Sequence, residues 1–159
     1  MATLVRSRSG VTVQGDTELL RTFEGLTGSL QRQVIRPAVQ AGATVLAKEI
    51  RRRAPVGPTR NLKRSVSSRA WTLPAKGIIG RVVGPAYPRG AHGHLVEFGH
   101  AMVTHAGATV GQVRPRPFMR PAMDASRGRV LVAIQQKARQ RIPLVAERAA
   151  RRALGRAVR

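Results

Sequence analysis

Apolar residues recur at three- and four-residue spacing through residues 34–50, which predicts an amphipathic helix. Pro37 then has to occupy a first turn or a kink, because proline inside a helix costs about 3 kcal/mol. Pro55 ends this helix at Arg53 or Ala54, since it moves the preceding residue out of the α region. A shorter helix is predicted to begin at the capping residue Asp16. The apolar stripe of the longer helix consists of Val34, Ile35, Ala38, Val39, Gly42, Val45, Leu46 and Ile50, and it also contains Glu49.

The pattern changes between Pro55 and Pro117 to short runs of β-branched residues separated by glycine and proline. Such runs are typical of strands joined by turns. We expect strands over residues 62–71, 78–83 and 95–98, with a turn at 73–77 that makes the first two a hairpin. Residues 99–111 are small and lack periodicity, so we expect a long exposed loop there.

A second long helix is predicted from Pro121 to Ile142, where Pro143 ends it. Residues 144–159 are rich in alanine and arginine and suit a short basic helix or an arm that orders on binding. The predicted fold class is α+β, with a small antiparallel sheet of three to four strands packed against two long helices. The expected organisation is an N-terminal arm (1–15), one domain (16–142, with a loop at 100–113) and a basic C-terminal tail (143–159).

The charge of the chain is strongly positive. Its 159 residues include 29 basic and 7 acidic ones, which gives a formal net charge of +22. Such self-repulsion favours a polyanionic or acidic partner. Arginine provides most of the basic residues and suits carboxylate and phosphate, although a GC-rich genome would produce the same bias. The chain has no cysteine, no apolar run long enough to span a membrane and no signal-peptide pattern at its start.

Catalytic patterns are missing from the sequence. The carboxylates are spread singly along the chain, which disfavours paired-carboxylate chemistry. The sequence contains a cluster of four histidines, His92, His94, His100 and His105. His92 and His94 could bind a transition metal if a third ligand folded over, but we interpret all four as solvated loop residues. A hydrolase using Ser65 or Ser67 with His94 lacks the Gly-x-Ser-x-Gly elbow. We therefore predict no enzyme, no cofactor and no metal site.

Two segments have unusual sequences. Glu97 lies in an apolar run, so we expect an arginine to pair with it, within the subunit or across a subunit boundary. Residues 114–122 contain three prolines that prevent regular strand pairing. This segment is either a rigid connector that places Phe118 and Met119 in the core, or it places its arginines at a subunit boundary. The candidate interface residues are Glu97, Phe98, Arg114, Arg116, Phe118 and Arg120.

A series of short motifs occurs in a defined order along the chain. They are Arg-Arg-Arg-Ala-Pro-Val (51–56), Asn-Leu-Lys-Arg-Ser (61–65), Val-Gly-Pro (83–85), Tyr87, Leu-Val-Glu-Phe-Gly (95–99) and Arg-Pro-Phe-Met-Arg-Pro-Ala (116–122). In this order they resemble the tail-completion and head-to-tail joining protein family of long-tailed bacteriophages, over roughly residues 16–140. The segment 101–113 and the tail after Pro143 lie outside the resemblance.

The resemblance implies a structural protein of the virion neck, made in the host bacterial cytoplasm. Its implied partners are further copies of itself in a ring, commonly a hexamer, a head-side connector or stopper protein, and the tail tube protein. Nonspecific contact with packaged DNA is a further expectation, and no membrane contact is expected. The alternative is a nonspecific nucleic-acid-binding protein of ribosomal or nucleoid type, suggested by the charge. Against it, the basic residues are scattered and no helix-turn-helix, RNP-type or zinc motif occurs.

Overall fold

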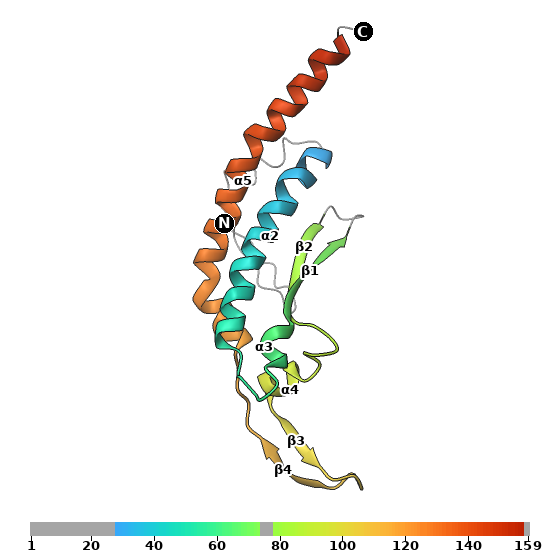
Figure 1. Ribbon diagram of the computed structural model, residues 1–159, viewed down its shortest axis with the longest axis vertical. Helices are drawn as coiled ribbons and strands as arrows, with labels where there is room; N and C mark the ends of the chain where they lie inside the picture. Colours follow the sequence, from blue (N-terminus) through green and yellow to red (C-terminus); the bar gives the residue numbers. More distant parts are fainter. Residues whose placement is uncertain (1–27, 74–77, 158–159) are drawn as a thin grey trace, which may run out of the picture.

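The fold is α+β, as predicted, in a computed structural model that describes residues 28–73 and 78–157 (Figure 1). The elements in chain order are α2 (Gly28–Arg53), α3 (Asn61–Ser65), β1 (Val66–Leu73), β2 (Ile78–Pro85), α4 (Gly93–Phe98), β3 (His100–Val103), β4 (Thr109–Val113) and α5 (Met119–Ala157). The predicted arm 1–15, the helix expected from Asp16 and most of the turn 73–77 lie outside the described residues.

Helix α2 lies between α5 on one side and the β1–β2 hairpin on the other (Figure 1). It therefore buries two faces, and small residues let both neighbours approach: Ala38, Ala43 and Ala47 are all buried. Gly42 marks a close approach of α2 to α5, because a Cβ atom there would lie 2.7 Å from Cγ1 of Ile134. The predicted apolar stripe of α2 is thus confirmed, and Pro37 lies inside the helix.

The core consists of two clusters along the α2–α5 interface. The lower cluster joins α2, α3, β1 and the start of α5, and its buried residues are Ala47, Ile50, Ala54, Leu62, Val66, Phe118 and Ala122. The upper cluster joins the first half of α2 to the second half of α5 through Val34, Ala38, Ala138 and Val145. Val145 lies beyond Pro143, so part of the predicted C-terminal tail belongs to the core.

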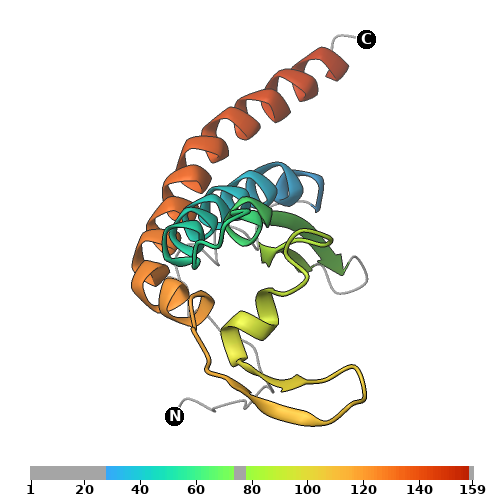
Figure 2. The same ribbon diagram turned by 60° about the horizontal axis from the view of Figure 1, so that its bottom comes forward.

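The prediction that Pro143 ends the last helix is wrong. Helix α5 runs for 39 residues with Pro143 inside it, and it curves along its length (Figure 2). The burial of Val145 gives the physical reason. Packing of this residue against α2 stabilises the helix beyond Pro143 and offsets the free-energy cost of a proline inside the helix. No helix in the described ranges is long and apolar enough to cross a membrane.

The four strands form two separate two-stranded antiparallel sheets, whereas one sheet of three to four strands was predicted. In the first sheet Val66 pairs with Pro85 and Leu73 with Ile78, which confirms the predicted hairpin. The first residues of the predicted strand 62–71 instead form the short helix α3. Leu62 of this helix is buried in the lower core cluster, so the helical turn places an apolar side chain in the core at this position.

Two further predictions between residues 95 and 113 are wrong. The expected strand 95–98 is the helix α4, and the expected loop 99–111 contains the β3–β4 hairpin. This hairpin projects away from the α2–α5 pair (Figures 1 and 2). Gly99 joins α4 to β3 with φ 72°, and a Cβ atom there would lie 2.5 Å from the carbonyl oxygen of Val113. Only glycine fits this position without strain.

Candidate assembly site

Glu97 on α4 binds the amino-terminal end of α5. Its side chain is 4% exposed. Oε2 accepts hydrogen bonds from the backbone N–H groups of Phe118 at 2.7 Å and Met119 at 3.0 Å. Oε1 accepts one from the N–H of Arg120 at 3.2 Å. A carboxylate at this end of a helix is stabilised by the helix dipole as well as by the hydrogen bonds.

These contacts satisfy every free N–H group in the first turn of α5. The N–H groups at the start of a helix have no partner within the helix. Glu97 takes three of them, Pro121 has none to offer, and Ala122 donates to the carbonyl of Phe118 at 3.2 Å. Glu97 was expected to pair with an arginine side chain. Within the described chain its hydrogen-bond partners are backbone groups, because the helix end already supplies the positive potential that a buried carboxylate needs.

The connector 114–118 holds the two helices in this arrangement. The backbone N–H of Arg116 donates to the carbonyl of Val96 at 2.8 Å. Phe118 is 1% exposed and lies in the lower core cluster, with Met119 packed against the same cluster. The prediction of a rigid connector that inserts Phe118 and Met119 into the core is therefore confirmed. Of the candidate interface residues, Glu97 and Phe118 lie inside the subunit.

The other four candidate residues are exposed. The guanidinium of Arg120 lies over the ring of Phe98, 5.5 Å from its centre, within the range of a cation–π contact. Both residues line a groove of about 540 Å³ whose other exposed aromatic residue is Tyr87. Arg114 and Arg116 line a separate groove of about 420 Å³, beside Val113 of β4. The structure thus brings Phe98 and Arg120 together and places Arg114 and Arg116 elsewhere.

The β3–β4 hairpin carries exposed apolar side chains. Val103 and Val110 are 62% and 63% exposed, and Met102 and Val113 are also exposed. An isolated two-stranded hairpin is marginally stable in water. Several exposed apolar side chains on one projecting hairpin favour a binding surface. Together with the groove at Phe98, this hairpin is the best candidate for contacts with another protein chain.

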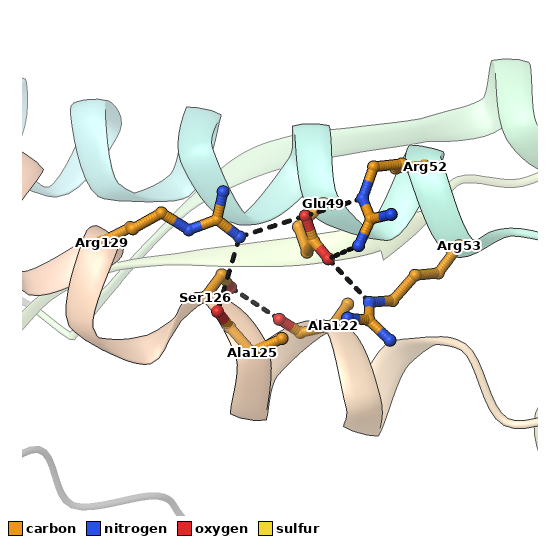
Figure 3. Close-up of polar contacts among 7 residues, drawn as sticks. All are labelled: Glu49, Arg52, Arg53, Ala122, Ala125, Ser126 and Arg129. Carbon is orange, nitrogen blue, oxygen red and sulfur yellow. Dashed lines mark hydrogen bonds and ion pairs between the residues drawn. The ribbon is translucent and has the colours of Figure 1, made fainter.

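A second carboxylate, Glu49 on α2, is surrounded by three arginines (Figure 3). Arg52 and Arg53 donate to it from the last turn of α2 at 2.6 and 2.7 Å, and Arg129 donates from α5 at 3.2 Å. The hydrogen bond from Arg52, followed by that from Arg53, holds the pKa of Glu49 far below its ordinary value, against the opposing effect of burial. Because Arg129 is on α5, its bond to Glu49 joins α5 to α2, and Arg129 also donates to the carbonyl of Ala125 on its own helix at 3.5 Å.

The serine and histidine residues that could have formed a catalytic or metal site do not form one among the described residues. The hydroxyl of Ser65 is buried and donates to the carbonyl of Leu62 at 2.8 Å. No hydrogen bond within the described ranges joins Ser65 or Ser67 to His94. Among the same residues, no group of three or more histidine, aspartate or glutamate side chains could hold a metal ion.

Glu97 is recognisable in the sequence as a carboxylate within an apolar run, but neither its backbone partners nor the Glu49 cluster was predicted. The Glu49 cluster has a signal within α2, because Arg52 and Arg53 follow at the three- and four-residue spacing of a helix face. Arg129 carries no such signal, since it lies 80 positions away in sequence. The partner of Glu97 also leaves no trace in the residue types, because backbone N–H groups are common to nearly all residues.

Comparison with known proteins identifies a family. The sequence model of the HK97-gp10-like family, described as "Bacteriophage HK97-gp10, putative tail-component", matches residues 17–99, more than half of the chain. The match includes α2, the β1–β2 hairpin and α4 with Glu97. Neither the curated proteins nor the solved structures give a significant match. The chain therefore belongs to the HK97-gp10-like family of bacteriophage tail components.

Proposed function

We propose that the protein is a structural subunit of the phage neck, which forms a ring that completes the tail and joins it to the head-side connector. The observation that carries this proposal is the exposed apolar surface of the β3–β4 hairpin on a member of a tail-component family. A projecting hairpin with exposed Val103 and Val110 needs a partner to bury these side chains. In a ring, each subunit supplies that partner to its neighbour.

The proposed subunit boundary contains the exposed candidate residues. Phe98 and Arg120 form one contact region on the groove at Tyr87, and Arg114 and Arg116 form another beside β4. A hexamer is the proposed ring, with a connector or stopper protein on the head side and the tail tube protein on the other. The rigid attachment of α4 to α5 through Glu97 supports this role, because it fixes Phe98 and Arg120 relative to the core.

Native mass spectrometry of the purified protein tests the ring, with a hexamer as the expected result. Electron microscopy of virions carrying a tagged copy tests its place, with label expected at the junction of head and tail. A protein that remains monomeric at high concentration and leaves no density at the neck would contradict the proposal.

The alternative function is nonspecific nucleic-acid binding of the ribosomal or nucleoid type. The net charge of +22 favours it. Purified particles separate the two functions, because a neck protein is retained in virions in a few copies, whereas a nucleoid protein remains with host DNA after lysis. Quantitative mass spectrometry of virions and of the host lysate provides the comparison.

A further inference from the structure

A cationic pocket lies where α2 ends and α3 begins, away from the groove at Phe98. Its volume is about 490 Å³, and it is lined by Arg51, Val56, Arg60, Lys63 and Arg64. Four of these five side chains are basic, and none is acidic. Like charges that converge on one cavity repel each other unless an anion occupies it. The pocket therefore has the composition of an anion-binding site.

The backbone and one side chain of the pocket are held in place by hydrogen bonds. Arg51 donates from Nη2 and Nε to the carbonyl of Val66, at 2.6 and 3.2 Å. The turn before α3 is closed by a bond from the N–H of Arg60 to the carbonyl of Gly57 at 3.0 Å. Arg60 adopts φ 54°, the left-handed conformation that side chains other than glycine adopt rarely. Residues held in such sparsely populated conformations are enriched at ligand-binding sites.

The carboxylates of the described residues are engaged or lie outside the pocket lining. Glu49 is bound by Arg52, Arg53 and Arg129, and Glu97 is bound by the start of α5. The other two, Asp124 and Glu147, are on α5 and do not line the pocket. The carboxylates of the described residues therefore do not neutralise the pocket, which leaves its four basic side chains available to an anion.

The residue types of the pocket indicate which anion fits. Guanidinium groups match the oxygens of phosphate through paired hydrogen bonds, and a lysine adds a flexible point charge. The lining has no aromatic ring for stacking a base and no amide side chain for reading a base edge. Other exposed basic residues on α2 and α5 do not line the pocket, and they include Arg32, Arg36, Lys48, Arg139, Arg148 and Arg151. The formal net charge of +22 exceeds what one small anion can neutralise, which favours a polyanion.

We propose that this pocket binds phosphate groups of a nucleic-acid backbone, without sequence preference. Arg60, Lys63 and Arg64 contact the phosphates, and Arg51, held by the carbonyl of Val66, supplies a fixed positive charge. The proposal concerns the monomer surface and does not depend on ring formation. Ring formation is measured by native mass spectrometry, so a failure of either proposal can be distinguished from a failure of the other.

Two triple variants of the full-length chain with equal net charge test the site. The pocket variant carries Arg60→Asn, Lys63→Gln and Arg64→Gln, in which asparagine suits the left-handed conformation. The control variant carries Arg139→Gln, Arg148→Gln and Arg151→Gln on α5. All six side chains are exposed, so both variants should keep the wild-type melting temperature. The single variants Lys63→Gln and Lys48→Gln provide a second matched pair if either triple variant unfolds.

Binding to a fluorescein-labelled duplex of random sequence is measured by anisotropy over a range of salt concentrations. We expect the pocket variant to lose at least about tenfold more affinity than the control variant. For the pocket variant, the slope of the logarithm of the association constant against the logarithm of the salt concentration should be less steep by about 2–3. The reason is that each lost phosphate contact reduces this slope by about 0.9. Labelled poly-glutamate is the second probe. Equal losses in both triple variants, or pocket-dependent binding of poly-glutamate without pocket-dependent binding of DNA, would overturn the proposal.

Discussion

Phe118 donates its backbone N–H to the carboxylate of Glu97 at 2.7 Å, across 21 positions of sequence. This bond joins two motifs that carry the resemblance to phage tail-completion proteins, Leu-Val-Glu-Phe-Gly and Arg-Pro-Phe-Met-Arg-Pro-Ala. The first motif supplies the acceptor, and the second supplies a helix start whose proline reduces the number of free donors. The two motifs therefore form one structural unit, which connects the exposed Phe98 to the core.

Replacement of Glu97 by glutamine should destabilise the protein. The amide group of glutamine is a donor, so it would face the N–H donors of α5 and leave at least one of them without a partner. A buried donor without a partner costs about 1–3 kcal/mol. For a protein of this size, each kcal/mol lowers the melting temperature by about 2–4 °C. Thermal unfolding followed by circular dichroism measures the change.

Glu147→Gln is the matched control for this variant, because Glu147 is exposed on α5. Surface substitutions of this kind usually change stability by less than about 0.5 kcal/mol. Equal melting temperatures for Glu97→Gln and Glu147→Gln would show that the contact with α5 contributes nothing.

Glu49 should make the stability of the protein depend on acid pH. Its pKa in the folded state is lowered from 4.5 by Arg52, Arg53 and Arg129, so the charged carboxylate stabilises the folded state. This contribution is complete above about pH 5 and is lost progressively as the pH falls below the unfolded-state value. Glu49→Gln removes it. In urea unfolding, the difference between wild type and Glu49→Gln should therefore be largest at pH 7 and shrink below about pH 4.5. A difference that stays constant down to pH 3 would contradict this role.

The long-range features of the fold were predictable only in part. The stripe of α2 and the β1–β2 hairpin follow from local periodicity, which the sequence displays directly. Helix α4 has only six residues, and the apolar residues of the segment 95–98 fit a strand period of two as well as a helix period of 3.6. The continuation of α5 through Pro143 depends on the burial of Val145 against Val34, which no local pattern contains. Tertiary contacts decide these elements, and a single sequence does not display them.

The contact between α2 and α5 at Gly42 should be sensitive to one methyl group. A Cβ atom at this position would lie 2.7 Å from Cγ1 and 2.9 Å from Cδ1 of Ile134. Overpacking of a helix interface costs about 1–3 kcal/mol, which exceeds the gain of up to about 1 kcal/mol from replacing glycine by alanine in a helix. We therefore expect Gly42→Ala to lower the free energy of unfolding in urea titrations.

Gly128→Ala on α5 is the matched control for Gly42→Ala, because nothing lies within 4 Å of a Cβ atom there. This variant should gain up to about 1 kcal/mol from helix propensity alone. In an Ile134→Ala background the two shortest contacts are removed and the contact with Cγ1 of Val130 at 3.2 Å remains, so Gly42→Ala should cost less than in the wild-type background. A Gly42→Ala protein as stable as Gly128→Ala would show that the two helices do not approach closely at this point.

The β3–β4 hairpin should contribute to assembly and little to the stability of the monomer. Val103→Thr with Val110→Thr keeps the β-branched shape of both side chains and replaces one methyl group of each by a hydroxyl. Both valines are more than half exposed, so the monomer should melt within a few degrees of wild type. In a ring contact the hydroxyls would be buried, at a cost of about 1–3 kcal/mol each where they lack a partner. The association constant should then fall at least tenfold, which corresponds to about 1.4 kcal/mol.

Val132→Thr on α5, which changes a half-exposed valine far from the hairpin in sequence, serves as the control. Native mass spectrometry over a dilution series measures the effect, and an unchanged oligomer distribution for the hairpin variant would remove the hairpin from the proposed interface.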